Sequence, residues 1–266
     1  MSGLAQLPPL VRSVAWTGSA LFWVVLLALL LAAGMPFVDA LLLALLLVVL
    51  PAISIAQLPL ADIAWIERQP AYWSSMVTLW LVGAACWLVG TRVGGPAAVG
   101  ITDIALLPLV SWTAALTAAG LGVIVGFRAI ALRLGIRESP ILRHLLPRSP
   151  KEKSSFALLS LTAGTCEEVA FRGYAIPMLA PVLGLPGSVV ATSLVFGVLH
   201  GYQGSLGVLR TSFMGFVLAV GFLVAGSLWP AMLAHALIDL VAGIALGERL
   251  LSPEPGAGVH EGEHPR

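Results

Sequence analysis

The stretch TCEEVAFRG, residues Thr165–Gly173, places two adjacent carboxylates and an arginine inside a run that is otherwise apolar enough to cross a membrane. A charged side chain at the centre of a bilayer costs about 2.5–3.5 kcal/mol on insertion scales. Three such groups within six residues are therefore not expected to face lipid. We predict that Glu167, Glu168 and Arg172 face a protein interior or a wet cavity and have partners there.

The composition of the whole chain agrees with a membrane protein. Of its 266 residues, 59% are hydrophobic and only 10% are charged, and the mean hydropathy is +0.99. A soluble domain carries about 25% charged residues. We therefore predict an all-α membrane protein, a polytopic bundle of about eight transmembrane helices. The net charge of +1 gives no indication of nucleic-acid binding.

Eight apolar segments have lengths near the roughly 20 residues that a bilayer requires, and the sixth is the shortest. They are residues 14–33, 37–56, 72–89, 104–127, 154–177, 187–200, 206–226 and 228–246. The first is longer than the core of a signal peptide, so we predict an uncleaved anchor. Two small-residue pairs, Gly122/Gly126 and Gly197/Gly201, allow helix backbones to approach closely and agree with a compact bundle.

A basic segment divides these spans into two groups of four. Seven of the fourteen basic residues lie within residues 128–153: Arg128, Arg133, Arg137, Arg143, Arg148, Lys151 and Lys153. Lys and Arg concentrate in cytoplasmic loops, so both termini are predicted to be cytoplasmic in a cell membrane. The predicted divisions are a lead (1–13), an N-terminal four-span bundle (14–127), a basic cytoplasmic linker (128–153), a second four-span region (154–247) and a disordered tail (248–266).

Helical spacing pairs the ionisable residues of the second region. Residues i and i+4 share a face of a helix, so Glu168 can pair with Arg172, and His235 can pair with Asp239. Glu167 then points about 100° away from Glu168 and is available for another role.

Two kinds of hydrolytic chemistry fit these residues. In the first, Glu167 is a general base that takes a proton from water, which His200 helps to position, and His235 stabilises the oxyanion. In the second, both histidines and a carboxylate bind a divalent metal such as zinc, which activates the water. The candidate metal ligands are Glu167, His200, His235 and Asp239. The residue types alone do not separate the two.

Three uses without catalysis remain open for the same groups. They can form a buried polar network that locks the bundle, or line the pathway of a transporter or proton relay. They can also belong to a non-catalytic scaffold or immunity protein that binds a partner in the membrane.

Three motifs in order resemble those of the CPBP intramembrane proteases, which include the type II CAAX prenyl proteases and the bacteriocin-immunity (Abi) proteins. The resemblance covers about residues 156–247 and implies an eight-helix membrane bundle with a cavity that opens from the membrane side. The motifs are Glu167-Glu168-xxx-Arg172, Phe196-xxx-His200 and His235-xxx-Asp239.

The resemblance implies an endopeptidase that cleaves a membrane-associated peptide or protein. Glu167 corresponds to the glutamate that activates water, and His200 works with it. His235 and Asp239 match the positions that hold the oxyanion. The family is named as metalloproteases, and a metal-free mechanism has been argued for eukaryotic members, whose substrates are prenylated C-terminal tails; metal dependence therefore stays open.

Two further points follow from the resemblance. Glu168 and Arg172 match its supporting pair. Asp239 stands where Asn is frequent in the family, and an ionised carboxylate cannot donate a hydrogen bond to an oxyanion as an amide can. Asp239 is then protonated, orients His235, or ligates a metal.

Overall fold

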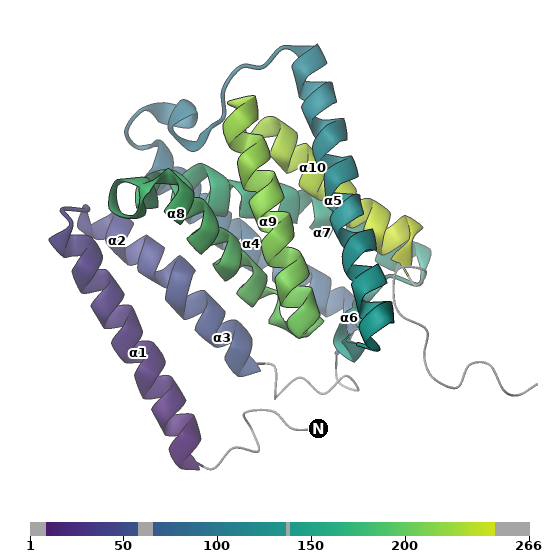
Figure 1. Cartoon of the computed structure of the whole chain (residues 1–266), viewed down its shortest axis with the longest axis horizontal. Helices are drawn as coiled ribbons and strands as arrows, with labels where there is room; N and C mark the ends of the chain where they lie inside the picture. Colours follow the sequence, from purple (N-terminus) through teal and green to yellow (C-terminus); the bar gives the residue numbers. More distant parts are fainter. Residues whose placement is uncertain (1–8, 58–65, 137–138, 248–266) are drawn as a thin grey trace, which may run out of the picture.

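The computed structural model describes residues 9–57, 66–136 and 139–247, and the regular structure in these ranges is entirely helical, as predicted. Figure 1 shows α1 and the α2–α3 helix on one side of the bundle and α5 on the other. The α-helices are α1 (Pro9–Ala32), α2 (Phe37–Ala44), α3 (Leu50–Gln57), α4 (Arg68–Thr91), α5 (Leu106–Leu134), α6 (Pro140–Leu145), α7 (Pro150–Glu168), α8 (Ile176–Leu199), α9 (Ser205–Ala225) and α10 (Trp229–Leu240). The π-helical turns are η2 (Leu45–Val49), η6 (Val169–Ala175) and η8 (Val241–Ala245), and the 3₁₀ turns are η5 (Gly95–Val99) and η7 (Gly201–Gln203).

All eight predicted spans lie within helical segments or extend beyond them by at most two residues at an end. Among the described residues, five apolar helical stretches are long enough to cross a membrane, and Ala20–Ala32 and Trp229–Ala245 are shorter apolar helices. The longest stretch, Pro150–Leu199, has 50 residues, about twice what a bilayer needs. Gly184 divides it, because its φ of 69° and ψ of 162° are not helical and are open to glycine. The fifth and sixth predicted spans are the two parts of this stretch.

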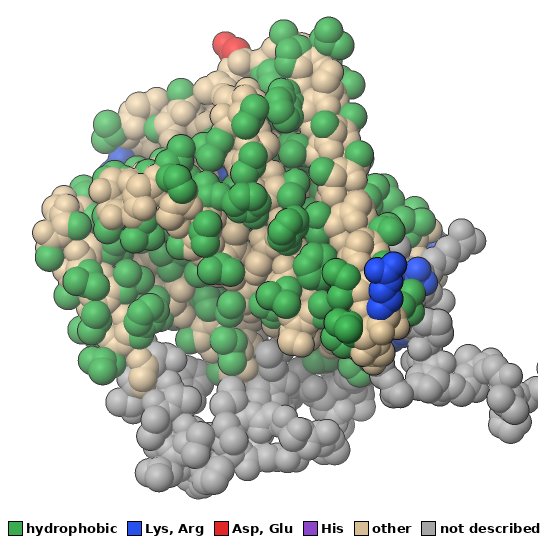
Figure 2. Space-filling view, viewed as in Figure 1, with side chains coloured by type: hydrophobic (Ala, Val, Ile, Leu, Met, Phe, Trp, Pro, Cys, Tyr) green, Lys and Arg blue, Asp and Glu red, His purple; other side chains and the backbone are tan. Residues whose placement is uncertain are grey.

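The predicted basic linker is partly helical. Helix α5 continues to Leu134 and ends at the left-handed Gly135, while α7 already begins at Pro150, behind a capping box made by Ser149 and Glu152. Figure 2 shows apolar side chains over most of the visible face and Lys and Arg atoms gathered near the C-terminal end of α5. The predicted tail lies outside the described residues, as do residues 1–8 of the lead and residues 58–65 of the loop before α4.

The short helix α6 is tied to the start of α4. Arg68 donates from Nε to the carbonyl oxygen of His144 at 2.5 Å, and the Tyr72 hydroxyl donates to the carbonyl oxygen of Leu145 at 2.5 Å. The His144 ring is 2.7 Å from the carbonyl oxygen of Ile66. These bonds hold the chain between α5 and α7 against the bundle.

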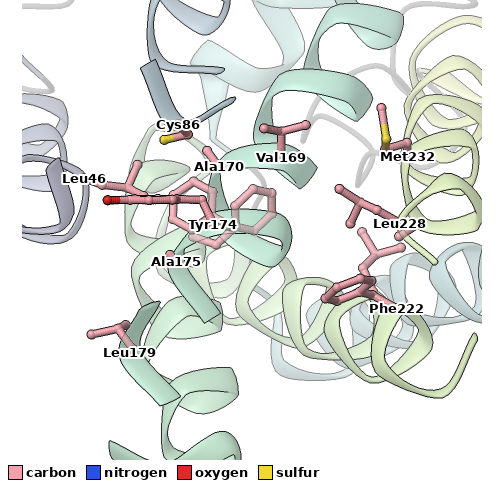
Figure 3. Packing of buried hydrophobic residues seen from close by; sticks show 14 of the residues in the cluster. Leu46, Cys86, Val169, Ala170, Tyr174, Ala175, Leu179, Phe222, Leu228 and Met232 are labelled. Atoms are coloured by element: carbon pink, nitrogen blue, oxygen red, sulfur yellow. The ribbon is translucent and has the colours of Figure 1, made fainter. Parts of the chain in front are cut away.

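The core surrounds η6, whose seven residues are all buried. Figure 3 shows Tyr174 and Ala170 of this turn beside Leu46 and Cys86, which come from η2 and α4. The turn therefore sits where the N-terminal helices meet the second half of the chain.

Glycines let two pairs of helices approach closely. A Cβ on Gly164 would lie 2.7 Å from the carbonyl oxygen of Met232, so the α7 and α10 backbones touch there. Gly197 of α8 lies against Ser212 of α9, a close approach of the kind that the small-residue pair permits. A Cβ on Gly122 or Gly126 meets no neighbouring atom within 4 Å in the described part of the chain, so that pair makes no such contact there.

Candidate active site

Both glutamates stand at the end of α7, immediately before the π-helical turn η6. A π-helix bonds residue i to i+5, so its wider turn changes the direction of every side chain that follows. Such turns occur frequently at functional sites. The turn carries Arg172 to the protein interior, where its side chain is 2% exposed.

Arg172 and Glu168 form the ion pair that their spacing predicts. Arg172 Nη1 donates to Glu168 Oε1 at 2.6 Å, and Nη2 donates to the carbonyl oxygen of Gly215 on α9 at 3.1 Å. The guanidinium also lies 4.4 Å from the centre of the Phe196 ring. Arg172 thereby links α9 and α8 to Glu168, which is fully buried.

Glu168 has a second partner, His235 of α10. The Nδ1 atom of His235 lies 2.8 Å from Glu168 Oε1, the same oxygen that Arg172 contacts. A carboxylate only accepts hydrogen bonds, so Nδ1 carries the hydrogen and the ring is held in one orientation. Helical spacing predicted only Arg172 as the partner of Glu168. It did not predict the contact with His235, because the two residues are 67 positions apart in the chain and no local spacing relates them.

The other ring nitrogen of His235 faces two more carboxyl groups. Its Nε2 atom lies 3.7 Å from Glu167 Oε2 and 3.7 Å from Asp239 Oδ2. These distances are too long for direct hydrogen bonds and suit bridging by water. The Asp239 side chain is 37% exposed, against 16% for Glu167, so the group is most accessible on the side of Asp239.

His200 caps the C-terminal end of α8 beside this group. Its Nδ1 atom lies 2.8 Å from the carbonyl oxygen of Phe196, which accepts, so Nε2 of the neutral ring is an acceptor. The Phe196 ring lies 4.8 Å from the His200 ring and 6.0 Å from that of His235, between centroids. Within the described residues His200 makes no hydrogen bond to Glu167; it joins the site through Phe196 and through electrostatic interaction with Asp239 and His235.

Tyr202, which the sequence analysis did not single out, lies two residues beyond His200 on η7. The two rings are 6.0 Å apart, and the Tyr202 hydroxyl accepts a hydrogen bond from Gln203 Nε2 at 3.2 Å. Burial raises the pKa of Tyr202 to about 12, with smaller contributions in the same direction from Asp239 and Glu167. The hydroxyl therefore keeps its proton near the site. The one feature of the sequence that could have identified Tyr202 is its position two residues after His200, a predicted site residue.

A metal held by Glu167, His200, His235 and Asp239 stays a prediction. Within the described ranges, no three His, Cys, Asp or Glu side chains come together to hold one ion. Glu167 and Asp239 face His235, while Nδ1 of His200 is bonded to Phe196. The reaction described below therefore assigns no step to a metal.

Comparison with known families supports a peptidase. Residues 150–241 match the family model described as type II CAAX prenyl endopeptidase Rce1-like. The match runs from the first residue of α7 to one residue beyond α10 and leaves residues 1–149 outside. It includes the predicted site residues Glu167, Glu168, Arg172, His200, His235 and Asp239. No curated protein and no solved structure matches the chain.

The apolar helices and the matched family together indicate a multi-pass membrane protein with protease activity. The resemblance seen in the three motifs is thereby confirmed. Residues 150–241 of this chain match the Rce1-like type II CAAX prenyl endopeptidases, a group within the CPBP family.

Proposed function

We propose that the protein is an intramembrane endopeptidase in which Glu167 activates water for attack on a peptide bond. The observation that carries this proposal is the position of His235. Glu168 holds its Nδ1 atom, and its Nε2 atom faces Glu167 and Asp239 at 3.7 Å each. An oriented imidazole beside a carboxylate is the pair of groups that acid–base hydrolysis requires.

The proposed reaction uses these groups in two stages. Glu167 takes a proton from water as the water oxygen bonds to the substrate carbonyl carbon, and the carbonyl oxygen becomes an oxyanion. His235 in its doubly protonated form donates from Nε2 to that oxyanion, while its Nδ1 hydrogen stays hydrogen-bonded to Glu168. When the C–N bond breaks, the proton held by Glu167 passes to the leaving nitrogen, and a carboxylic acid and an amine are released.

The remaining groups have supporting roles in this proposal. His200, whose Nε2 accepts in the neutral ring, helps to position the attacking water. Asp239 orients His235 from the exposed side, a role that does not require a carboxylate to donate a hydrogen bond. Arg172 holds Glu168, which holds His235.

The proposed substrate is a membrane-associated peptide or protein. Prenylated C-terminal peptides are the first class to test, because the matched family is described by them. We place the protein in the cell membrane with both termini in the cytoplasm. The basic residues of the end of α5 and the start of α7 support this orientation.

The base assignment is tested with purified protein in liposomes and quenched fluorescent peptides, prenylated and unmodified. Glu167→Gln removes the base with little change in shape, and we expect the cleavage rate to fall by about 10²–10⁴-fold. Glu67→Gln is the matched control, because Glu67 is exposed before α4 and its side chain makes no cap bond. Full cleavage by Glu167→Gln would retire the assignment. Proton or ion flux that depends on His235, without cleavage, would favour a transporter.

A further inference from the structure

A second buried acid lies outside the candidate active site. Asp39 of α2 is 1% exposed, although it belongs to a helix long and apolar enough to span the membrane. Arg92, which follows α4, donates hydrogen bonds to both carboxylate oxygens of Asp39. The Nη1–Oδ1 distance is 2.8 Å, and Nη2 contacts Oδ2. A fork of this kind fixes the carboxylate in both position and direction.

The third group on this carboxylate is Tyr174, which belongs to η6. Its hydroxyl lies 3.2 Å from Asp39 Oδ1 and 3.4 Å from the carbonyl oxygen of the same residue. Tyr174 follows Arg172 by two residues and Glu168 by six. Asp39 therefore binds the turn that continues directly from the two glutamates.

A π-helical turn needs support from its surroundings. Its hydrogen bonds are less favourable than those of an α-helix, and π-turns persist mainly as single turns. A change of register by one residue would rotate the following side chains by about 100°. Arg172 would then leave Glu168, and Glu168 would lose the group that fixes it against His235.

Neighbouring elements pack closely against Gly173 and Tyr174 of η6. A Cβ on Gly90 of α4 would lie 3.2 Å from Tyr174 Cδ2, so this glycine makes room for the ring. A Cβ on Gly173 would lie 2.7 Å from the carbonyl oxygen of Val99 on η5. In Figure 3 the Tyr174 ring lies among the buried apolar residues. The hydroxyl contact with Asp39 is the polar part of this support.

The helical stretch that contains Asp39 also contacts the end of α8, next to His200. Ser54 of α3 donates from Oγ to the carbonyl oxygen of Leu199 at 3.0 Å, one residue before His200. The helical stretch Phe37–Gln57 therefore touches both the glutamate-bearing turn and the end of α8. None of its residues belongs to the segment matched by the family model.

We propose that Asp39, fixed by Arg92, is a positioning residue of the hydrolytic site that sets the register of η6 through Tyr174 and thereby the placement of Glu168 against His235. This inference rests on the proposed peptidase function. A buried ion pair is seldom more stabilising than apolar residues of the same volume, so stability alone does not account for Asp39. The need to fix the direction of the Tyr174 hydroxyl does account for a buried acid at this position.

The first test separates turnover from substrate binding. Asp39→Asn places an amide donor against the Arg92 donors, and Tyr174→Phe removes only the hydroxyl. We expect each to lower kcat by about tenfold or more with little change in KM, because a small misplacement of catalytic groups slows chemistry strongly. The double variant should be no slower than the slower single variant, since both break one linkage. The controls are Asp103→Asn, at an exposed position, and Tyr72→Phe, which loses a hydrogen bond to α6.

The second test needs no enzymatic activity. Histidine-labelled protein gives a ¹⁵N resonance for His235 Nδ1, which reports its hydrogen bond to Glu168. We expect this resonance to shift in Asp39→Asn and Tyr174→Phe toward its value in Glu168→Gln, and to stay in place in both controls. A purely structural role would lower the melting temperature and leave the resonance and kcat unchanged.

The two readouts distinguish the two proposals. If the wild-type protein cleaves no peptide while the resonance shifts as expected, the peptidase proposal fails, and the linkage from Asp39 through Tyr174 to His235 stands without a hydrolytic role. If cleavage depends on Glu167 but neither kcat nor the resonance responds to Asp39→Asn and Tyr174→Phe, the positioning role is overturned. Additive losses in the double variant would also overturn it, because independent effects do not share one linkage.

Discussion

The Nδ1 atom of His235 and the Oε1 atom of Glu168 are 2.8 Å apart, so the second glutamate of the pair holds the histidine and the first takes no part in this hydrogen bond. The same oxygen accepts from Arg172 at 2.6 Å. Two donors on one carboxylate oxygen define where the imidazole lies and which nitrogen it turns toward Glu167. The adjacent glutamates therefore lie against different nitrogens of the same imidazole ring.

Replacement of Glu168 by Gln should slow catalysis and leave substrate binding nearly unchanged. The amide weakens two charge-assisted hydrogen bonds, and one such bond contributes about 1.5–3 kcal/mol. If that energy is needed only to orient His235, kcat falls by about ten- to a hundredfold. Steady-state kinetics on reconstituted protein measures this, with Glu67→Gln as the control. An unchanged kcat would show that His235 keeps its orientation without Glu168.

Gly164→Ala should separate α7 from α10. The added Cβ would lie 2.7 Å from the carbonyl oxygen of Met232 and 2.8 Å from the Ala236 nitrogen, and backbone atoms cannot move aside as a side chain can. Overpacking of this kind costs about 1–3 kcal/mol. We expect a lower melting temperature together with loss of cleavage, because His235 moves away from Glu168.

Gly122→Ala is the matched control for this change. Gly122 is exposed on α5, and a Cβ there meets nothing within 4 Å. Alanine is also the better helix former by about 1 kcal/mol. The control should keep full activity and an equal or higher melting temperature. Equal behaviour of the two variants would contradict the close contact between α7 and α10.

The ion pair between Asp39 and Arg92 should respond unequally to removal of its partners. The Asp39 side chain is 1% exposed and that of Arg92 is 39% exposed. Arg92→Gln leaves a buried carboxylate without its counter-charge, and an unpaired buried charge is strongly destabilising. Asp39→Asn leaves a guanidinium that can turn to water, so it should destabilise less.

Thermal unfolding in detergent orders these variants. The double variant, Asp39→Asn with Arg92→Gln, should be more stable than Arg92→Gln alone, because no buried charge is then left unpaired. If Asp39→Asn is the more destabilising single change, the expectation is contradicted. The guanidinium of Arg92, and not the carboxylate of Asp39, is then the charge that needs its partner.

Chelation decides the metal requirement. The proposed reaction uses side chains only, and within the described ranges no three potential ligands meet at one point. We therefore expect a zinc chelator to leave the cleavage rate within about twofold, a factor worth less than 0.5 kcal/mol in activation free energy. Loss of activity on chelation and its return with zinc would instead support a metal held by His200, His235 and a carboxylate.

The prediction from sequence was most successful where the governing physics is local. Hydrophobicity summed over a segment indicates a span, and all eight predicted segments are helical. Helical spacing likewise placed Glu168 beside Arg172 and His235 near Asp239. Small-residue spacing carries less information, because small residues permit close contact without selecting which face of a helix meets a neighbour. Gly197 contacts Ser212, whereas a Cβ on Gly122 or Gly126 meets nothing within 4 Å among the described residues.

The amino-acid sequence by itself determined that the chain is a helical membrane bundle and that its charged groups must be inside, since transfer of a charge into hydrocarbon is costly wherever it lies in the chain. Only the tertiary structure decided that Glu168 holds His235, that a π-turn follows the glutamates, and that Asp39 reaches that turn through Tyr174. These contacts join residues of separate helices. They depend on the angle and depth at which helices pack, which no single segment encodes.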